Sequence, residues 1–292
     1  MKLDQQRVKK FQTFIFSWWK THKRDLPWRH THDPYKIFVS EVMLQQTQVL
    51  RVIAKYREFI ERYPTVYDLA QASSAEVLRM WKGMGYNRRA LYLKKTAQVI
   101  VEQYQGIFPK NEKDLCSLPG LGTYTARAIL VFAYRENITI VDTNIRQIIT
   151  HFFFSDILQK ESLIDEVADQ LLPKGKSWEW HQALMDYGAL RLARPCSGQA
   201  LRRSFTLRNE CASQGKRSNK SRLKIPFRES NRFYRGRIMD RLREGDIHQS
   251  DLIKEFTGTY GKSEDFILMI LQGLEADGLI SRLQSGIVCL PE

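Results

Sequence analysis

Two carboxylates in this sequence stand in apolar surroundings, where an acidic side chain could do chemistry. Asp142 follows the short apolar run Ile138–Val141, and Asn144 opens the next predicted helix. Glu41 lies in the middle of a long helix predicted over residues 35–51, among apolar residues that can pack inward. Such a carboxylate is either a surface residue between apolar neighbours or a partly buried acid with a shifted pKa. The helical periodicity alone favours the surface position for Glu41.

A tight turn, Leu118–Gly122, precedes Asp142 in the chain. Pro119 fixes φ, and Gly120 and Gly122 permit a positive φ or a close approach of the backbone. Residues 123–134 follow as a predicted helix with apolar residues at helical spacing. A glycine-rich turn that opens a helix presents backbone N–H groups and the positive end of the helix dipole, which together suit a phosphate. A turn without any ligand is the alternative interpretation of the same residues.

The composition favours a basic globular protein with a polyanionic partner. The chain has 292 residues, of which 43% are hydrophobic and 27% charged, and its formal net charge is +14. This length is enough for one large or two smaller domains, and the excess of cations favours nucleic acid as a partner. No apolar run approaches the roughly 20 residues of a membrane span, and the N-terminus is too polar for a signal peptide. The cysteines are scattered and indicate reduced thiols in a cytosolic protein.

These motifs resemble those of a group of DNA repair enzymes. The segment LPGLGTYTA at 118–126, followed by VDTN at 141–144, resembles the helix-hairpin-helix (HhH-GPD) DNA glycosylases. LPWR at 26–29, followed by DPYKIFVSEVMLQQTQV at 33–49, is similar, almost letter for letter, to the MutY-type adenine DNA glycosylases of that superfamily. The resemblance covers about residues 20–193. It implies DNA glycosylase chemistry for those residues.

The resemblance implies a role for each matching residue. It makes Glu41 the catalytic acid and Asp142 the second catalytic carboxylate, with Tyr124 and Asn144 also in the catalytic set. It implies an adenine pocket that contains Trp28, Arg29 and Gln182. It implies DNA contacts for a longer set, Gln45, Gln46, Thr47, Met84, Tyr86, Leu118, Gly120, Gly122 and Thr123. Within that set Gln46 would enter the base stack, and Met84 and Tyr86 would reach the base opposite the adenine. Ordinary packing at a helix start is the alternative for Tyr86.

Two carboxylates suit the removal of a base. The N-glycosidic bond breaks through a transition state that resembles an oxocarbenium ion, as in glycoside hydrolysis. Adenine is a poor leaving group as an anion, so it needs a proton at N7, which Glu41 could supply if an apolar pocket holds it protonated. Asp142, kept ionised, would stabilise the sugar cation or attack it transiently. The adenine must first leave the duplex, which Gln46 and the backbone contacts would assist.

Two positions depart from the catalytic pattern of relatives. Helix-hairpin-helix enzymes that also cut the DNA backbone carry a lysine nucleophile two residues after the second glycine of the turn, and this chain has Tyr124 there. Without an amine at that position a Schiff base cannot form, so we expect a monofunctional glycosylase. Thr143 stands where the family mostly has glycine, which makes the neighbourhood of Asp142 bulkier.

A third departure concerns the cofactor. The family usually carries four cysteines that hold a four-iron four-sulfur cluster, and the first would fall at Leu192. This chain offers only Cys196 and Cys211 nearby, which cannot supply four thiolates. We therefore expect a member without the cluster, with no metal and no other cofactor.

The resemblance implies an all-α fold with a two-lobed HhH-GPD core, to which the sequence adds a small C-terminal domain resembling a winged helix. The core would span residues 1–200, with a six-helix lobe over about 24–135 and a second lobe from 1–23 and 136–200. Residues 201–227 form a basic linker that either contacts phosphates or is merely solvated. Residues 228–292 predict three helices and then a hairpin, a shape common among DNA-binding modules, although a packing or partner-binding module is the alternative.

The leading hypothesis is therefore a DNA glycosylase of base excision repair that removes adenine mispaired with 8-oxoguanine or guanine. We expect double-stranded DNA as the partner, a monomer, and a cytoplasmic, nucleoid-associated location without membrane contact. A thymine or uracil glycosylase acting on G·T or G·U mismatches is the alternative of the same class. A lesion-binding protein without catalysis is the alternative of another class, and the presence of both Glu41 and Asp142 argues against it.

Overall fold

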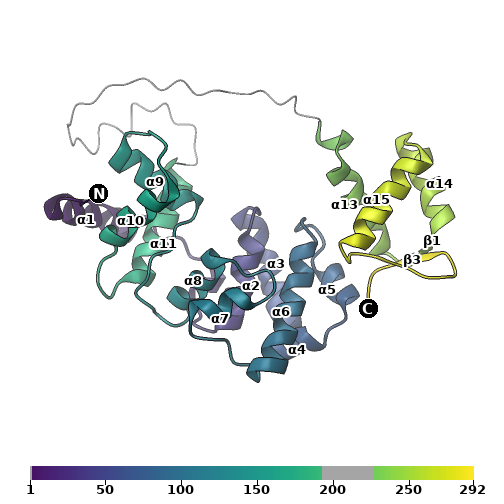
Figure 1. Cartoon of the computed structure of the whole chain (residues 1–292), viewed down its shortest axis with the longest axis horizontal. Helices are drawn as coiled ribbons and strands as arrows, with labels where there is room; N and C mark the ends of the chain where they lie inside the picture. Colours follow the sequence, from purple (N-terminus) through teal and green to yellow (C-terminus); the bar gives the residue numbers. More distant parts are fainter. Residues whose placement is uncertain (1, 193–225) are drawn as a thin grey trace. The chain divides into compact units, whose positions relative to one another are not determined.

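A computed structural model describes residues 2–192 and 226–292 of the chain (Figure 1). The chain divides into two compact units: unit 1 comprises residues 1–34 and 122–220, and unit 2 comprises residues 35–121 and 221–292. The predicted basic linker lies almost wholly outside the described residues. The domain boundaries given above stay predictions. No helix within the described ranges is long and apolar enough to cross a membrane.

Unit 1 is a bundle of helices whose members come from both ends of its sequence. They are α1 (Gln5–His22), the short η1 (Pro27–Arg29), α8 (Thr123–Phe132), α9 (Thr143–Phe154), α10 (Glu161–Leu171), α11 (Ser177–Tyr187) and the π-helical turn η2 (Gly188–Leu192). Helix α1 begins where the Asp4 carboxylate accepts hydrogen bonds from the amides of Gln6 and Arg7. Its Phe11, Ile15 and Trp19 recur at helical spacing and belong to one buried cluster with residues of α9, α10 and α11. The N-terminal helix is therefore part of the core of this unit.

The larger part of unit 2 is a second helical bundle built from one continuous segment. It contains α2 (Pro34–Leu44), α3 (Val49–Arg62), α4 (Val66–Gln71), α5 (Ser74–Met80), α6 (Arg88–Tyr104) and α7 (Glu112–Ser117). Helices α4 and α5 are short, and each begins with a capping box, formed by Thr65 with Asp68 and by Ser73 with Glu76. These caps satisfy the first amides of helices that are too short to be stable alone.

The single long helix predicted over residues 35–51 is wrong. Helix α2 ends at Leu44, residues 45–48 form a turn, and α3 begins at Val49. Gln46 has a positive φ of 53°, a backbone conformation that cannot continue a right-handed helix. The apolar spacing on both sides of the turn hides this break, because each helix by itself has a regular buried face. Helix α11 ends at Tyr187, and the chain continues as the π-helical turn η2.

The C-terminal part of unit 2 consists of three helices and a small antiparallel sheet. Its elements are η3 (Phe227–Glu229), α13 (Asn231–Leu242), β1 (Ile247–His248), α14 (Gln249–Tyr260), α15 (Glu264–Ala276), β2 (Ser281–Arg282) and β3 (Ile287–Cys289). The strand order is β1-β3-β2, so the predicted hairpin gains a third strand that the sequence analysis did not foresee. A helix and strand, two helices and then a hairpin give a winged-helix-like module. The all-α fold class with this small C-terminal domain is confirmed.

Candidate active site

Asp142 is the N-cap of helix α9, and its carboxylate is held by two hydrogen bonds. One oxygen accepts from the amide of Ile145 at 2.7 Å, and the other accepts from Nδ2 of Asn144 at 3.0 Å. Burial raises the pKa of Asp142 above its ordinary value, although the bonds from Ile145 and Asn144 oppose that rise. Asn144, the residue predicted to act beside Asp142, is therefore in direct contact with it.

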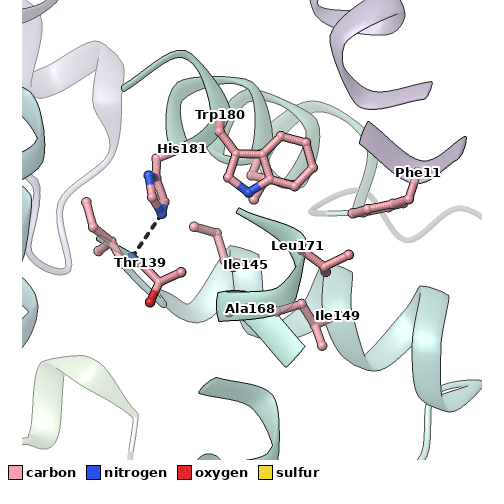
Figure 2. Close-up of a pocket in the computed structure, with 10 residues that line it drawn as sticks. Phe11, Thr139, Ile145, Ile149, Ala168, Leu171, Trp180 and His181 are labelled. Atoms are coloured by element: carbon pink, nitrogen blue, oxygen red, sulfur yellow. Dashed lines mark hydrogen bonds between the residues drawn. The ribbon is translucent and has the colours of Figure 1, made fainter. Parts of the chain in front are cut away.

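The segment 138–141 that delivers Asp142 is pinned by the first turns of helix α11. Ser177 Oγ donates to the carbonyl of Ile138 at 2.9 Å, and the amide of Ile140 donates to Nε2 of His181 at 2.9 Å (Figure 2). His181 Nδ1 lies 2.7 Å from the carbonyl of Ser177, so Nδ1 carries the proton and Nε2 is the acceptor. Burial lowers the pKa of His181 to about 4 and keeps the imidazole neutral. The sequence analysis missed Ser177 and His181, because a sequence pattern does not reveal hydrogen-bond partners that lie 39 and 41 positions apart in the chain.

A small cavity lies beside this pinned segment within unit 1 (Figure 2). Its walls are mostly apolar side chains of the core cluster, including Ile145, Leu171 and Trp180, and Thr139 and His181 supply the polar edge. Thr139 Oγ1 donates to Asp169, so the polar edge is already bonded within the protein. The cavity is therefore a gap in the packing of the core and has no polar group aimed into it that would select a base.

Asn144 is pressed against the π-helical turn η2. Gly188 opens this turn, and a Cβ added at that position would stand 2.6 Å from Cβ of Asn144. Only a glycine allows the two backbones to approach so closely. Helical insertions of the π type are frequent at functional sites. The hydrogen bond from Asn144 to Asp142 thus depends on the absence of a side chain at residue 188.

The predicted pocket residues Trp28, Arg29 and Gln182 are all buried in unit 1. Arg29 makes two hydrogen bonds of 2.8 Å with the two carboxylate oxygens of Asp186, a fully buried residue. The carboxylate of Asp186 also accepts from Trp19 Nε1 at 2.8 Å and pairs with Arg24. Burial alone would raise the pKa of Asp186, but the Arg29 and Arg24 guanidiniums outweigh it and hold that pKa below its usual range. Arg29 therefore anchors the segment that follows α1 to helix α11.

Glu41 is buried in α2, with 7% of its surface exposed. The surface position favoured by periodicity is therefore wrong. Ser40, Val42 and Met43 of α2 are buried as well as Glu41, so successive residues around this helix are shielded from solvent on all sides. A helix buried all round has no polar face, and the argument from periodicity fails for it.

A single arginine, Arg89, joins the two turns of unit 2 that were predicted to touch DNA. Its guanidinium donates to the carbonyls of Val42 and Met43 at the end of α2, at 2.8 and 3.2 Å. It also donates to Thr47 Oγ1 at 3.0 Å and to the carbonyl of Met84 at 3.1 Å. Burial lowers the pKa of Arg89 to about 10, which leaves it charged at neutral pH. The predicted contacts Gln45, Gln46, Thr47, Met84 and Tyr86 thus lie on two turns held by one cation.

Arg89 was also missed, although the sequence contains a signal for it. The residue occupies the same face of α6 as the buried Ala90, Leu93, Ala97 and Ile100. An arginine on the apolar face of a helix has to find acceptors in the interior, since a buried guanidinium without partners is strongly unfavourable. The turn it supports has positive φ at Gly83, Gly85 and Tyr86. Tyr86 is 42% exposed, whereas Met84 is buried at 3%.

The turn Leu118–Gly122 uses its glycines in two different ways. Gly120 has a φ of 75°, and a Cβ there would stand 2.7 Å from Cγ of Tyr92, so glycine is required. Thr96 Oγ1 donates to the carbonyl of Pro119 at 2.6 Å and fixes the turn. Gly122 caps α8 without a side-chain bond, and open space surrounds the position of its missing Cβ. Together with exposed Thr123, this helix start presents backbone amides outward, as a phosphate site requires.

The predicted site residues therefore form two groups. Unit 1 holds Trp28, Arg29, Gly122, Thr123, Tyr124, Asp142, Asn144 and Gln182, and unit 2 holds Glu41, Gln45, Gln46, Thr47, Met84, Tyr86, Leu118 and Gly120. Within the first group the structure shows Asp142 and Asn144 in contact. Within the second it links the 45–47 turn to the 83–86 turn, through Arg89 and through a weak bond of 3.5 Å from Thr47 Oγ1 to the carbonyl of Met84.

Comparisons with known proteins identify the family of this chain. The family model of the HhH-GPD superfamily base excision DNA repair proteins matches residues 39–174. An adenine DNA glycosylase of Mycobacterium tuberculosis is 33% identical over 291 residues, which cover 96% of this chain and 93% of that protein. The chain belongs to the HhH-GPD superfamily.

Two further relatives match a smaller part of this HhH-GPD chain. An adenine DNA glycosylase of Mycolicibacterium smegmatis is 42% identical over 178 residues, and this chain spans 61% of that protein's length. The solved structure of a thermostable thymine-DNA glycosylase has 32% identity and a TM-score of 0.61, covering 65% of this chain and 89% of that one.

The cysteines of this HhH-GPD chain do not fit the iron–sulfur cluster that the resemblance implies. Leu192, at the position of the first ligand, ends η2 and has no sulfur. Cys196 and Cys211 lie outside the described residues, and Cys116 and Cys289 lie in α7 and in β3. Among the residues that the structure describes, no group of three or more His, Cys, Asp or Glu side chains could hold a metal ion. Only Cys196, Cys211 and Cys289 follow α11 in the sequence, and three cysteines cannot provide four thiolates.

Proposed function

We propose that this protein is an adenine DNA glycosylase that acts as a monomer on adenine paired with 8-oxoguanine or guanine in duplex DNA. The observation that carries the proposal is the pair of carboxylates: Glu41 is buried in the middle of α2, and Asp142 caps α9. Two relatives named adenine DNA glycosylases support it, at 42% and 33% identity. The net charge of +14 suits a nucleic-acid partner.

Glu41 and Asp142 have different roles in the proposed reaction: Glu41 acts as the acid, and Asp142 acts as the anion. Glu41 in its protonated form donates a proton to N7 of adenine, the bond between N9 and C1′ breaks, and the electron pair leaves with the base. The carboxylate of Asp142 stabilises the positive charge that develops at C1′. Water adds to C1′ and releases a proton, which restores the acid form of Glu41. The products are free adenine and an abasic site.

The outward-facing helix start and the turns around Arg89 account for binding. The amides of Gly122 and Thr123 suit a DNA phosphate, since a helix N-terminus attracts anions. Gln46 and Tyr86 are exposed at the two turns that Arg89 fixes, and exposed side chains on rigid turns suit insertion beside an extruded base. Extruding the base requires a few kcal/mol, which these contacts supply.

Thymine release is the second candidate function. The solved thermostable thymine-DNA glycosylase is 32% identical over 65% of this chain, so its fold and much of its sequence are shared. A pyrimidine leaves as a stabilised anion and needs less help from an acid than adenine does. The buried Glu41 in α2 therefore favours adenine.

One assay tests both functions. Duplexes containing A·8-oxoG, A·G, T·G and U·G are incubated with the full-length protein in single-turnover conditions, and half of each sample is heated in alkali. We expect adenine release from the first two duplexes, with strand breaks only after alkali, because Tyr124 offers no amine for a Schiff base. Release of thymine or uracil alone would replace the adenine proposal with the second candidate. Cleavage before alkali would disprove monofunctional chemistry.

We also propose that the activity needs no iron–sulfur cluster. The expected result is purified protein with no stoichiometric iron and no visible absorption band, whose rate of adenine release is unchanged after chelation. Iron at about four atoms per chain, lost together with activity on chelation, would disprove this proposal and show that the chain holds a cluster.

A further inference from the structure

The C-terminal module makes specific contacts with the helical bundle of unit 2. Arg243, at the end of α13, donates from Nε to the carbonyl of Leu78 at 2.9 Å and from NH2 to Oδ1 of Asn87 at 2.8 Å. Its side chain is 5% exposed, and it also pairs with Asp240 at 2.6 Å. Arg88 in turn lies 3.4 Å from Asp277 of the module. A buried guanidinium with three acceptors fixes an orientation, because its planar fork accepts only matching geometry.

These contacts surround the turn that carries Tyr86. Asn87 and Arg88 follow Tyr86 directly, and the guanidinium of Arg232 in the first turn of α13 lies 4.2 Å from the centre of the Tyr86 ring. Arg89 lies 5.5 Å from the same ring. Cations placed within about 6 Å of an aromatic ring are attracted to it. The Tyr86 ring therefore has one cation from the core of the bundle and a second from the C-terminal module.

Arg232 is exposed to solvent, and its stacking leaves its donors usable. A guanidinium stacked on a ring keeps its N–H groups in its own plane, where they can donate to two oxygens of one phosphate. Arg88, Arg51 and Lys82 are exposed cations beside this turn, and Arg51 bonds the carbonyl of Gly83 at 3.3 Å. The positive charges and N–H donors of this surface suit the phosphates of a phosphodiester backbone.

We propose that Arg232 is a DNA-backbone contact, presented next to Tyr86 by the docked C-terminal module. It binds a phosphate of the duplex that meets the 83–86 turn. The module thereby belongs to the DNA-binding face of unit 2. The proposal rests on the proposed function, because it takes the 83–86 turn to meet duplex DNA.

The test compares two arginines of the same helix in the full-length protein. Arg232→Ala removes the cation at Tyr86, and Arg237→Ala removes another exposed cation, which lies 5.3 Å from the centre of the Phe233 ring in the same module. The probe is an A·8-oxoG duplex whose adenosine carries a non-hydrolysable 2′-fluoro sugar. Binding is measured by fluorescence anisotropy at several salt concentrations. Asn87→Ala, which removes one acceptor of Arg243, weakens the docking itself without changing any charge.

We expect Arg232→Ala to weaken binding about tenfold, as for loss of a hydrogen bond to a charged group, and to lower the salt slope by about 0.9. Arg237→Ala should change affinity less than threefold and leave the slope unchanged, and Asn87→Ala should shift affinity in the same direction as Arg232→Ala. Equal effects of the two arginine variants would overturn the proposal. Tighter binding by Arg232→Ala would overturn it too, since Arg232 would then shield Tyr86 from DNA. Wild-type protein that binds the probe but releases no adenine from the same A·8-oxoG duplex with an ordinary deoxyadenosine would defeat the proposed function and leave this inference standing.

Discussion

Asp142 and Glu41 lie in regions that position a carboxylate by different means. Asp142 ends an irregular segment, and side chains from α11 hold that segment through Ile138 and Ile140. Glu41 lies within the regular backbone of α2, and Arg89 donates to carbonyls near the end of that helix and to the two turns of the same region. The first region uses side-chain bonds to place the reacting group. The second uses them to place the turns that meet the partner.

The largest expected effect comes from neutralising either carboxylate. Asp142→Asn and Glu41→Gln should each slow adenine release at saturating DNA by at least about a thousandfold, because one removes the anion and the other the acid. Duplex affinity should stay within about threefold, as both changes keep the shape of the side chain. Single-turnover rates and anisotropy measure the two quantities.

The stability of the same variants gives the control. Because burial raises the pKa of Asp142, the charged form is disfavoured in the folded state. The contribution of Asp142 to stability is therefore greatest below the pKa of the unfolded chain and falls as pH rises through the folded pKa. Asp142→Asn should thus melt at or above the wild-type temperature at neutral pH. A lower melting temperature with lost activity would mean that the variant had simply unfolded.

The next effect concerns the region of Glu41. Arg89→Met keeps much of the stem but leaves carbonyls of Val42, Met43 and Met84 without their donor, and should lower the free energy of unfolding by about 3 kcal/mol or more. DNA binding should weaken as both turns loosen. Urea denaturation measures the loss, with Lys82→Met as the control, since exposed Lys82 should change stability by less than about 0.5 kcal/mol. Equal stability of the two variants would refute the role of Arg89.

A pH effect of similar or smaller size should come from the region of Asp142. His181 has a folded pKa of about 4, whereas an ordinary histidine titrates near 6.5. Between these two pKa values the unfolded chain binds a proton at His181 and the folded chain does not. The contribution of His181 to the free energy of unfolding is therefore complete above about pH 6.5 and is lost as pH falls towards 4. The total is roughly 3 kcal/mol at most.

His181→Gln, which cannot titrate in this range but keeps an acceptor for Ile140, is the matched variant. The difference in unfolding free energy between wild type and variant should shrink or change sign between pH 7.5 and pH 4.5. A difference that stays constant over that range would show that His181 has the same pKa in the folded and the unfolded chain, so that burial does not lower it.

The smallest expected effect comes from a single methyl group. Gly188→Ala places a Cβ 2.6 Å from Asn144, so Asn144 must shift and its bond to Asp142 weakens. We expect a rate about tenfold lower with a stability loss of about 1–2 kcal/mol. Gly236→Ala is the control: a Cβ there meets nothing within 4 Å, and alanine in a helix is worth up to about 1 kcal/mol more than glycine. If the two variants release adenine equally fast, Asn144 does not position Asp142.

The sequence was sufficient for features that depend on neighbouring residues. The helical class, the turn at Gly120 and the cap position of Asp142 follow from local chemistry, as do the three helices and hairpin of the C-terminal module. The break after Leu44 could not be predicted from the sequence. The carbonyls at the end of α2 accept hydrogen bonds from Arg89, which lies more than 40 residues later in the chain. Arg29 carried a local motif, but its pairing with Asp186 spans 157 positions. Patterns report spacing along the chain, and these bonds join distant segments.

The discontinuous sequence of unit 1 has a consequence for its synthesis. Helix α1 carries Phe11, Ile15 and Trp19, whose partners on α11 are made only when the chain reaches Trp180 and Asp186. At about 5–20 residues per second, roughly 10 to 30 s pass between the two events. The bundle from α2 to α7 is complete well before then. The aromatic face of α1 therefore lacks its partners while the ribosome makes the rest of the core, and in this interval it is a target for chaperones and for association with other nascent chains.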